Sequence, residues 1–209
     1  MALKRRVRPT HRFVGVEQRC MERGCVGRTL RSLGNTKMER IVVIGTSCSG
    51  KTTFAREFAK ILDIEHIELD ALYWEPNWKV RDSEQFKSLV ESRTNKARWI
   101  VDGNYSMVRD ILWLRATTII WLNYAFPIVL YRAIVRSFKR SMTKEVLFSG
   151  NQESFRRSFL SKESIILWVI NTHSENRRRY SSLLSSASAK LIEFKTTNET
   201  KKFLKNLML

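Results

Sequence analysis

The sequence predicts an α/β fold with a central parallel sheet between two layers of helices. Residues 41–44 form a short apolar run of β-branched side chains, which is typical of a strand buried on both faces of such a sheet. Apolar residues then recur at helical spacing over residues 51–62. Further short apolar runs alternate with helical patterns to the end of the chain, which favours a three-layer α/β/α arrangement with five parallel strands.

The elements are expected in the following order. In the first helix, Phe54, Phe58 and Ile61 share one face, and Asp63 ends it. The remaining strands are short apolar runs, and the remaining helices repeat apolar residues every three or four positions. We expect strands at 66–69, 99–101, 117–122 and 191–194, and helices at 86–96, 127–141, 162–184 and 199–207.

The composition indicates one folded domain. Of the 209 residues, 43% are hydrophobic and 11% aromatic, which is enough apolar surface for a core. Lys and Arg number 38 against 20 Asp and Glu, so the net charge is +18 and an acidic tail protein is excluded. The three cysteines follow no disulfide or zinc-site spacing, so we expect a reducing, cytoplasmic environment. The longest uncharged stretch, 116–131, has 16 residues, fewer than the roughly 18 of a membrane helix, so we expect no membrane association.

The first 37 residues differ in composition from the rest. They carry ten basic and two acidic residues, and so contribute +8 of the net charge of +18. They show neither helical nor strand periodicity. This segment is compatible with a disordered basic arm, an organelle transit peptide, or a stretch upstream of a true start at Met38. We therefore expect the folded domain to comprise residues 38–209.

The strongest motif in the sequence lies between the first expected strand and the first expected helix. It matches the phosphate-binding pattern G-x-x-x-x-G-K-[ST] at every fixed position. The glycines allow backbone N–H groups to point at phosphate oxygens, Lys51 reaches the β and γ phosphates, and the Thr52 hydroxyl ligates Mg²⁺. We assign the following residues to ATP binding: Gly45, Thr46, Ser47, Cys48, Ser49, Gly50, Lys51, Thr52 and Thr53.

Two aspartates follow expected strands directly. Asp102 comes after residues 99–101, where a carboxylate is needed to hold Mg²⁺, although it is also placed to cap a turn with Gly103. Asp70 comes after residues 67–69, and we expect it to accept a proton from a substrate hydroxyl or to hold a water molecule. The alternative for Asp70 is a solvated turn residue.

Aromatic side chains and arginines supply the remaining candidates. Tyr73, Trp74 and Trp78 are expected in a loop, where they either stack on an acceptor or pack against the next helix. Arg132, Arg136 and Arg140 recur every four residues and either contact phosphates or form a solvated basic face. We count Lys51, Asp70, Asp102, Arg132 and Arg136 as catalytic candidates. A polar segment with Gly150, Asn151, Gln152, Glu153, Arg156 and Arg157 predicts a mobile lid at about 136–163.

Further motifs extend over nearly all of residues 38–209. They are Met38-Glu39-Arg40-Ile41, Leu69-Asp70-Ala71-Leu72-Tyr73-Trp74 with Pro76-Asn77-Trp78, Asp102-Gly103-Asn104-Tyr105 with Arg109, Gly150-Asn151-Gln152-Glu153-Ser154, and Leu167-Trp168 with Thr172-His173. With these motifs the sequence resembles the adenylate kinase-like P-loop kinases, and in particular the bacterial group known as DNA topology modulation proteins. The sequence departs from that group at Thr117, Asn123 and Gln152, where the group usually has an acidic residue, an Asp and an Arg.

The resemblance implies a P-loop kinase core with a helical, arginine-bearing lid that uses ATP and Mg²⁺. It places Asp102 and Gly103 near the metal and Arg109 near the acceptor. It also implies that Gly103, Asn104 and Tyr105 join Asp70, Trp74, Trp78 and Arg109 in binding the substrate. Thr52 and Asp102 are the expected metal ligands. The acceptor itself is left open between a nucleotide and another small molecule, as is the choice between a monomer and a homodimer.

Other functional classes fit the sequence less well. A regulatory GTPase needs an Asn-Lys-x-Asp motif, but Asn95-Lys96 is followed by Ala97 and Arg98. A transporter-type ATPase normally has a glutamate after the strand-end aspartate, where this sequence has Gly103. The main alternative is a P-loop ATPase that binds nucleic acid, because the net charge is +18 and Arg177, Arg178 and Arg179 form a basic cluster. We expect nucleic acid to be a secondary partner.

Overall fold

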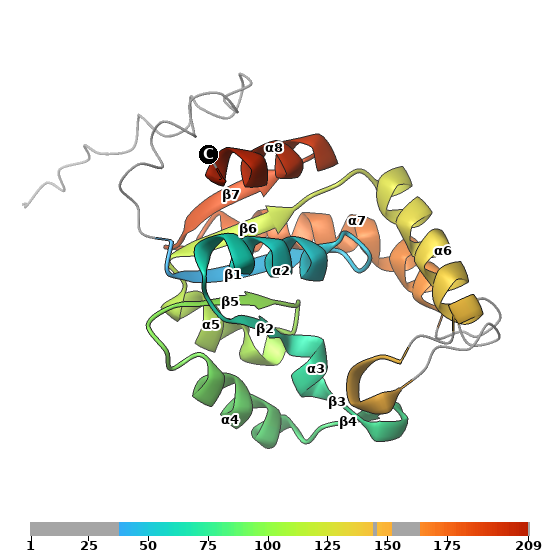
Figure 1. Ribbon diagram of the computed structural model, residues 1–209, viewed down its shortest axis with the longest axis horizontal. Helices are drawn as coiled ribbons and strands as arrows, with labels where there is room; N and C mark the ends of the chain where they lie inside the picture. The colour runs from blue at the N-terminus through green and yellow to red at the C-terminus, as the bar shows by residue number, and fades with distance from the viewer. Residues whose placement is uncertain (1–37, 144–145, 152–163, 209) are drawn as a thin grey trace, which may run out of the picture. The chain divides into compact units, whose positions relative to one another are not determined.

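The structure, a computed structural model, describes residues 38–143, 146–151 and 164–208 (Figure 1). The expected basic extension, residues 1–37, lies outside the described residues. So do Gln152, Glu153, Arg156 and Arg157 of the expected lid. The described residues confirm the three-layer α/β/α architecture.

Five parallel strands form the central sheet in the order β2-β5-β1-β6-β7. Their bounds are Arg40–Gly45 (β1), His66–Glu68 (β2), Trp99–Asp102 (β5), Thr118–Leu122 (β6) and Lys190–Phe194 (β7). In this register Asp102 of β5 lies beside Val43 of β1 on one side and beside Glu68 of β2 on the other. The carboxyl ends of these three strands therefore meet at one edge of the sheet.

Helices cover both faces of the sheet. They are α2 (Lys51–Leu62), α3 (Leu69–Tyr73), α4 (Ser83–Arg93), α5 (Arg109–Arg115), α6 (Phe126–Thr143), α7 (Ile165–Leu184) and α8 (Thr197–Leu207). Helices α2 and α8 lie on one face, and α5 and α7 lie on the other (Figure 1). Helix α6 packs against α7 beyond the carboxyl ends of the strands.

Each face of the sheet has its own apolar core. On the α2 and α8 face, four rings pack with neighbouring centroids 5.1 to 6.3 Å apart, namely those of Phe54, Phe58, Phe194 and Phe203. On the opposite face, alternate residues of β1 pack against α5 and α7 through Val42, Ile44, Leu112, Tyr180 and Leu184. Side chains alternate across a strand, so the continuous apolar run in β1 supplies both cores.

The structure corrects several expected boundaries. Helix α4 begins at Ser83 rather than residue 86, because the Asp82 carboxylate accepts hydrogen bonds from the N–H groups of Glu84 and Gln85. Strand β2 ends at Glu68, and α3 begins at Leu69. Helix α7 begins at Ile165, after the capping hydroxyl of Ser164.

The expected loop around Trp74 is also wrong, because the segment is ordered into short elements. Strand β3 (Trp74–Glu75) and strand β4 (Lys79–Val80) form an antiparallel hairpin around a 3₁₀ turn, η3 (Pro76–Trp78). We call residues 74–80 the acceptor hairpin, after the predicted role of Trp74 and Trp78 in binding the acceptor. Further 3₁₀ turns occur at Ser106–Val108 (η4) and Phe148–Gly150 (η5). Elements this short leave too few residues for a periodic sequence signal.

Within the described ranges, no helix combines the length and apolar character needed to cross a bilayer.

Gly103 offers a test of the packing at the end of β5. Its φ is +143°, and a Cβ there would lie 2.8 Å from Leu69 Cβ and from Leu69 Cδ1. We expect Gly103→Ala to lower the free energy of unfolding by about 2 kcal/mol in urea denaturation, because it combines overpacking with backbone strain. Gly150→Ala is the control, since φ there is +80° but no atom of the described residues lies within 4 Å of the added Cβ. Equal losses in the two variants would contradict the packing argument.

Candidate active site

The phosphate loop joins β1 to α2 and is tightly folded. The N–H of Ser49 donates to the Thr46 carbonyl at 3.0 Å. A Cβ at Gly45 would lie 2.7 Å from Ser49 Oγ and 2.8 Å from the Leu122 carbonyl oxygen, so a larger residue does not fit there. The loop therefore keeps a compact path that ends at the amino terminus of α2, where backbone N–H groups and the helix dipole favour an anion.

Lys51 lies within this loop and faces the carboxylates at the end of the sheet. Its Nζ donates to the carbonyl oxygens of Gly45 at 3.0 Å and Thr46 at 3.2 Å. Loss of hydration lowers the pKa of Lys51, and the negative charges of Asp70 and Asp102 act in the opposite direction. The structure thus brings Lys51 close to both predicted catalytic aspartates.

Asp102 is the most tightly held carboxylate of the site. Its side chain is only 3% exposed, and both of its oxygens are hydrogen-bonded. The Thr52 hydroxyl donates to Oδ2 at 2.7 Å, and His66 Nε2 donates to Oδ1 at 2.7 Å. A buried carboxylate needs such partners, because desolvation of an unpaired charge is costly.

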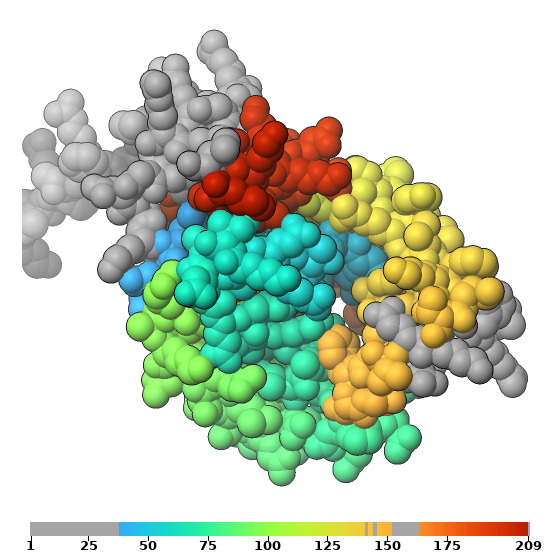
Figure 2. Space-filling view, in the orientation of Figure 1, coloured from blue at the N-terminus to red at the C-terminus, as the bar shows by residue number. Residues whose placement is uncertain are grey.

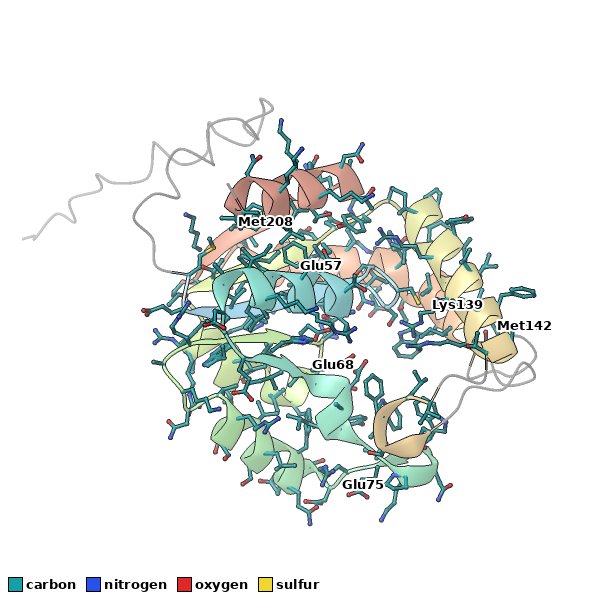
Figure 3. The ribbon with its side chains drawn as sticks, in the orientation of Figure 1. Glu57, Glu68, Glu75, Lys139, Met142 and Met208 are labelled. Atoms are coloured by element: carbon teal, nitrogen blue, oxygen red, sulfur yellow. The ribbon has the colours of Figure 1, made fainter. Side chains whose placement is uncertain are left out.

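Two residues of β2 belong to the site although the sequence analysis did not select them. His66 holds Asp102, and Glu68 Oε1 lies 3.2 Å from the Thr52 hydroxyl. Figure 3 shows Glu68 at the carboxyl end of β2, beside α3. The detectable signal was the alternation of two polar residues, 66 and 68, on one face of a short strand that ends at the candidate site.

Glu68 adds negative charge to this part of the site. Burial raises the pKa of Glu68, and the neighbouring charge of Asp102 raises it further. Neighbouring carboxylates such as those of Glu68 and Asp102 repel each other unless a cation lies between or beside them. The end of the sheet is therefore suited to a divalent cation or to a bound proton.

The residues of the site fit the expected Mg²⁺ and ATP. Among the residues that the structure describes, there is no cluster of three or more His, Cys, Asp or Glu arranged to enclose a metal. Mg²⁺ commonly uses one or two protein oxygens together with phosphate oxygens and water, so Thr52 and Asp102 fit an ion that arrives with a nucleotide. The compact loop with Lys51 fits the phosphates of that nucleotide.

The acceptor candidates lie close to one another around α3. The Tyr105 hydroxyl donates to Asp70 Oδ1 at 2.6 Å. Burial raises the pKa of Tyr105, and the charge of Asp70 raises it further, so Tyr105 remains a hydrogen-bond donor. The indole rings of Trp74 and Trp78 pack edge to face with centroids 5.6 Å apart. The structure thus brings Asp70, Tyr105, Trp74 and Trp78 together near the start of α3.

Tyr73 has a packing role. Its ring centroid lies 5.3 Å from that of Phe86 and 4.4 Å from that of Tyr105. The sequence left two roles open for these aromatic residues, namely stacking on an acceptor or packing against the next helix. Tyr73 packs against the next helix, α4.

Asn104 and Arg109 make their contacts outside the acceptor hairpin. The Asn104 side chain brackets Gly45, accepting from its N–H at 3.4 Å and donating to its carbonyl. Arg109 lies over the Trp113 ring, 5.8 Å from its centroid, and lines a small cavity with Gly103 and Tyr180. The assignment of Gly103, Asn104 and Arg109 to acceptor binding stays a prediction.

Two of the predicted arginines on α6 face the phosphate loop. Arg132 Nη1 donates to the Ser49 carbonyl, and its guanidinium lies 5.1 Å from the Tyr124 ring centroid. The charge of Arg136 contributes to lowering the pKa of Lys51, so this guanidinium lies in the same electrostatic environment. Arg136 Nε is buried and has no hydrogen-bond partner within the described part of the chain. The contact of either arginine with a bound phosphate group stays a prediction.

Together the strand order, the phosphate loop after β1 and the Thr52–Asp102 contact define a P-loop NTPase fold of the kinase type. No family model and no curated protein matches the sequence. Solved structures with a similar fold include the shikimate kinase of Aquifex aeolicus, with 15% identity, a TM-score of 0.49, and coverage of 81% of this chain and 93% of that one.

Two further solved structures give similar values. The shikimate kinase of Acinetobacter baumannii, determined in complex with shikimate, has 15% identity, a TM-score of 0.48, and coverage of 83% and 92%. A gluconokinase of Sinorhizobium meliloti has 14% identity, a TM-score of 0.45, and coverage of 82% and 94%. None of these comparisons addresses the DNA topology modulation proteins, so that narrower resemblance stays a prediction.

Glu68 yields a test of the electrostatics at the sheet edge. Its pKa in the folded protein lies above the ordinary value of 4.5, so the folded state binds this proton more tightly than the unfolded state. The charged form of Glu68 therefore opposes folding at higher pH, and this cost disappears as the pH falls through the raised pKa. We expect Glu68→Gln to raise the melting temperature at pH 8, and to raise it less at pH 5.

The measurement is thermal denaturation in metal-free buffer, with Glu57→Gln as the control because Glu57 is exposed on α2 (Figure 3). A lower melting temperature for Glu68→Gln at pH 8 would show that the contact with Thr52 outweighs the repulsion from Asp102.

Proposed function

We propose that this chain is an ATP-dependent kinase that transfers the γ-phosphoryl group of Mg·ATP to a small-molecule or nucleotide acceptor. One observation carries the proposal. Lys51 lies close to two aspartates, each of which has its own hydrogen-bond partner. Asp102 is bound to Thr52 of the phosphate loop, whereas Asp70 is bound to Tyr105 beside the acceptor hairpin. This arrangement provides a donor side and an acceptor side that meet at one cation.

On the donor side, the phosphate loop would hold the nucleotide, and Thr52 and Asp102 would hold its Mg²⁺. When bound, Mg·ATP supplies the transferring group and the metal neutralises part of its charge. Lys51, Arg132 and Arg136 contribute fixed positive charge where negative charge develops during transfer. Because these cations are already positioned by the protein, little reorganisation is needed during the reaction.

On the acceptor side, Asp70 is the base that receives the hydroxyl proton. Tyr105 donates to Oδ1 of Asp70, which orients the carboxylate and leaves Oδ2 available to the acceptor. Trp74 and Trp78 would contact the body of the acceptor through their ring faces or edges. The chemistry of this side suits a hydroxyl nucleophile that needs orientation and deprotonation.

Lys51→Ala tests the kinase proposal directly. We expect ADP release from Mg·ATP to rise well above background with one acceptor from a panel of nucleoside monophosphates, nucleosides and small hydroxyl compounds. In Lys51→Ala this turnover should be lost, while circular dichroism shows an intact fold, because the variant removes the charge that stabilises the transferring group. If the variant retained the activity, the mechanism would be wrong. If no acceptor worked but DNA stimulated hydrolysis, the nucleic-acid alternative would replace the kinase.

His66 yields a second test, because it holds one oxygen of the expected metal ligand Asp102. Removing a residue that orients a metal ligand typically weakens metal binding about 10- to 100-fold. We therefore expect His66→Ala to raise the Mg²⁺ concentration needed for half-maximal binding of a non-hydrolysable ATP analogue by about tenfold. His66→Gln, which keeps an N–H donor, should recover part of the loss. Unchanged Mg²⁺ dependence in both variants would rule out this orienting role.

A further inference from the structure

The segment that follows α6 contacts the acceptor hairpin through one buried amide side chain. Asn151 is 4% exposed and uses both ends of its side chain. Its Oδ1 accepts from the Trp78 N–H at 2.8 Å. Its Nδ2 donates to the carbonyls of Glu75 at 2.9 Å and Phe148 at 2.8 Å. The bonds to Trp78 and Glu75 join the two segments, and a third such hydrogen bond runs from Ser149 Oγ to the Trp74 carbonyl at 2.7 Å.

The backbone at this contact is held in an uncommon conformation. Asn77, Trp78 and Ser149 all have positive φ, at 61°, 58° and 54°. Residues other than glycine occupy this region only when their surroundings compensate for the strain. The hydrogen bonds of Asn151 supply such compensation, because they lie on both sides of the η3 turn that carries Trp78.

The same stretch of chain also reaches the phosphate loop. Arg132 of α6 donates to the Ser49 carbonyl, and η5 follows α6 along the chain. Figure 1 shows η5 beside β3 and β4, and Figure 2 shows its atoms against those of the hairpin. Residues 126–143 therefore contact the phosphate loop, and residues 146–151 contact the acceptor hairpin.

We propose that Asn151 is a positioning residue that fixes the acceptor hairpin, and with it Trp78, relative to the donor side of the site. Asn151 does not contact the reacting atoms. It acts through the Trp78 backbone and through the edge-to-face pair of Trp74 and Trp78. The consequence for catalysis rests on the proposed kinase function, whereas the consequence for the hairpin does not.

Amide hydrogen exchange followed by NMR on the full chain tests the structural part. In Asn151→Ala the Trp78 N–H loses its acceptor, so we expect it to exchange at least about tenfold faster than in the wild type. Asn151→Asp keeps an acceptor for that N–H, so Trp78 should remain protected. Asn171→Ala, an exposed change on α7, is the matched control and should leave the exchange unchanged. Equal protection of Trp78 in wild type and Asn151→Ala would overturn the proposal.

A milder substitution, Ser149→Ala, provides the test if Asn151→Ala does not fold. Ser149→Ala removes only the bond to the Trp74 carbonyl, and it should speed exchange in the hairpin by a smaller factor. No change in the hairpin amides of Ser149→Ala would then count against a joint between the two segments.

Steady-state kinetics with the identified acceptor tests the catalytic part. We expect Asn151→Ala to raise the KM for the acceptor about tenfold, because the hairpin loses its bound orientation, while the KM for ATP changes less than twofold. Equal changes in both constants, or no change in either, would overturn the positioning role. If no acceptor is phosphorylated by the wild type, the kinase proposal fails, and the exchange experiment still decides the role of Asn151 in the hairpin.

Discussion

The hydrogen bond between the Thr52 hydroxyl and Asp102 is the contact on which the rest of the site depends. It joins the first turn of α2 to the end of β5, and the parallel pairing of β1 with β5 brings these two points together. A carboxylate that is 3% exposed requires hydrogen-bond donors, and Thr52 and His66 each supply one. The position of the phosphate loop and the position of Asp102 are therefore set by one arrangement of strands.

Charge is separated across this arrangement. The carboxylates of Glu68, Asp70 and Asp102 all come from strand ends or the residues that follow them, and Arg132 and Arg136 come from α6. Lys51 lies among the carboxylates, which favour its charged form against the loss of hydration. Fixed charges of opposite sign on two sides of a phosphate site resist collapse onto each other only if a rigid scaffold holds them. The sheet and the packing of α6 against α7 provide that scaffold.

Much of this arrangement could be predicted from the sequence, for identifiable reasons. The strand before the phosphate loop, the loop itself and Asp102 carry local signals, because a buried strand and a glycine-rich turn are written in consecutive residues. The alternation of polar residues 66 and 68 points to one face of β2, but the particular roles of His66 and Asn151 cannot be predicted from neighbouring residues, since their partners lie 36 and 73 residues away in the chain. The acceptor hairpin has strands of two residues each, so no periodicity could reveal it.

The parts of the site come from two kinds of segment, the elements of the sheet and the segments inserted between them. The phosphate loop and Asp102 belong to the sheet and its first helix, whereas the acceptor hairpin and the segment 146–151 are both insertions between sheet elements. These two insertions meet through polar contacts, above all the hydrogen bonds of Asn151 with Trp78 and Glu75. Directional bonds of this kind specify one geometry but contribute little apolar burial, so the insertions can diverge without disturbing the core. Under the proposed kinase function, the choice of acceptor would be a property of these two insertions, and the capacity for phosphoryl transfer would be a property of the sheet edge.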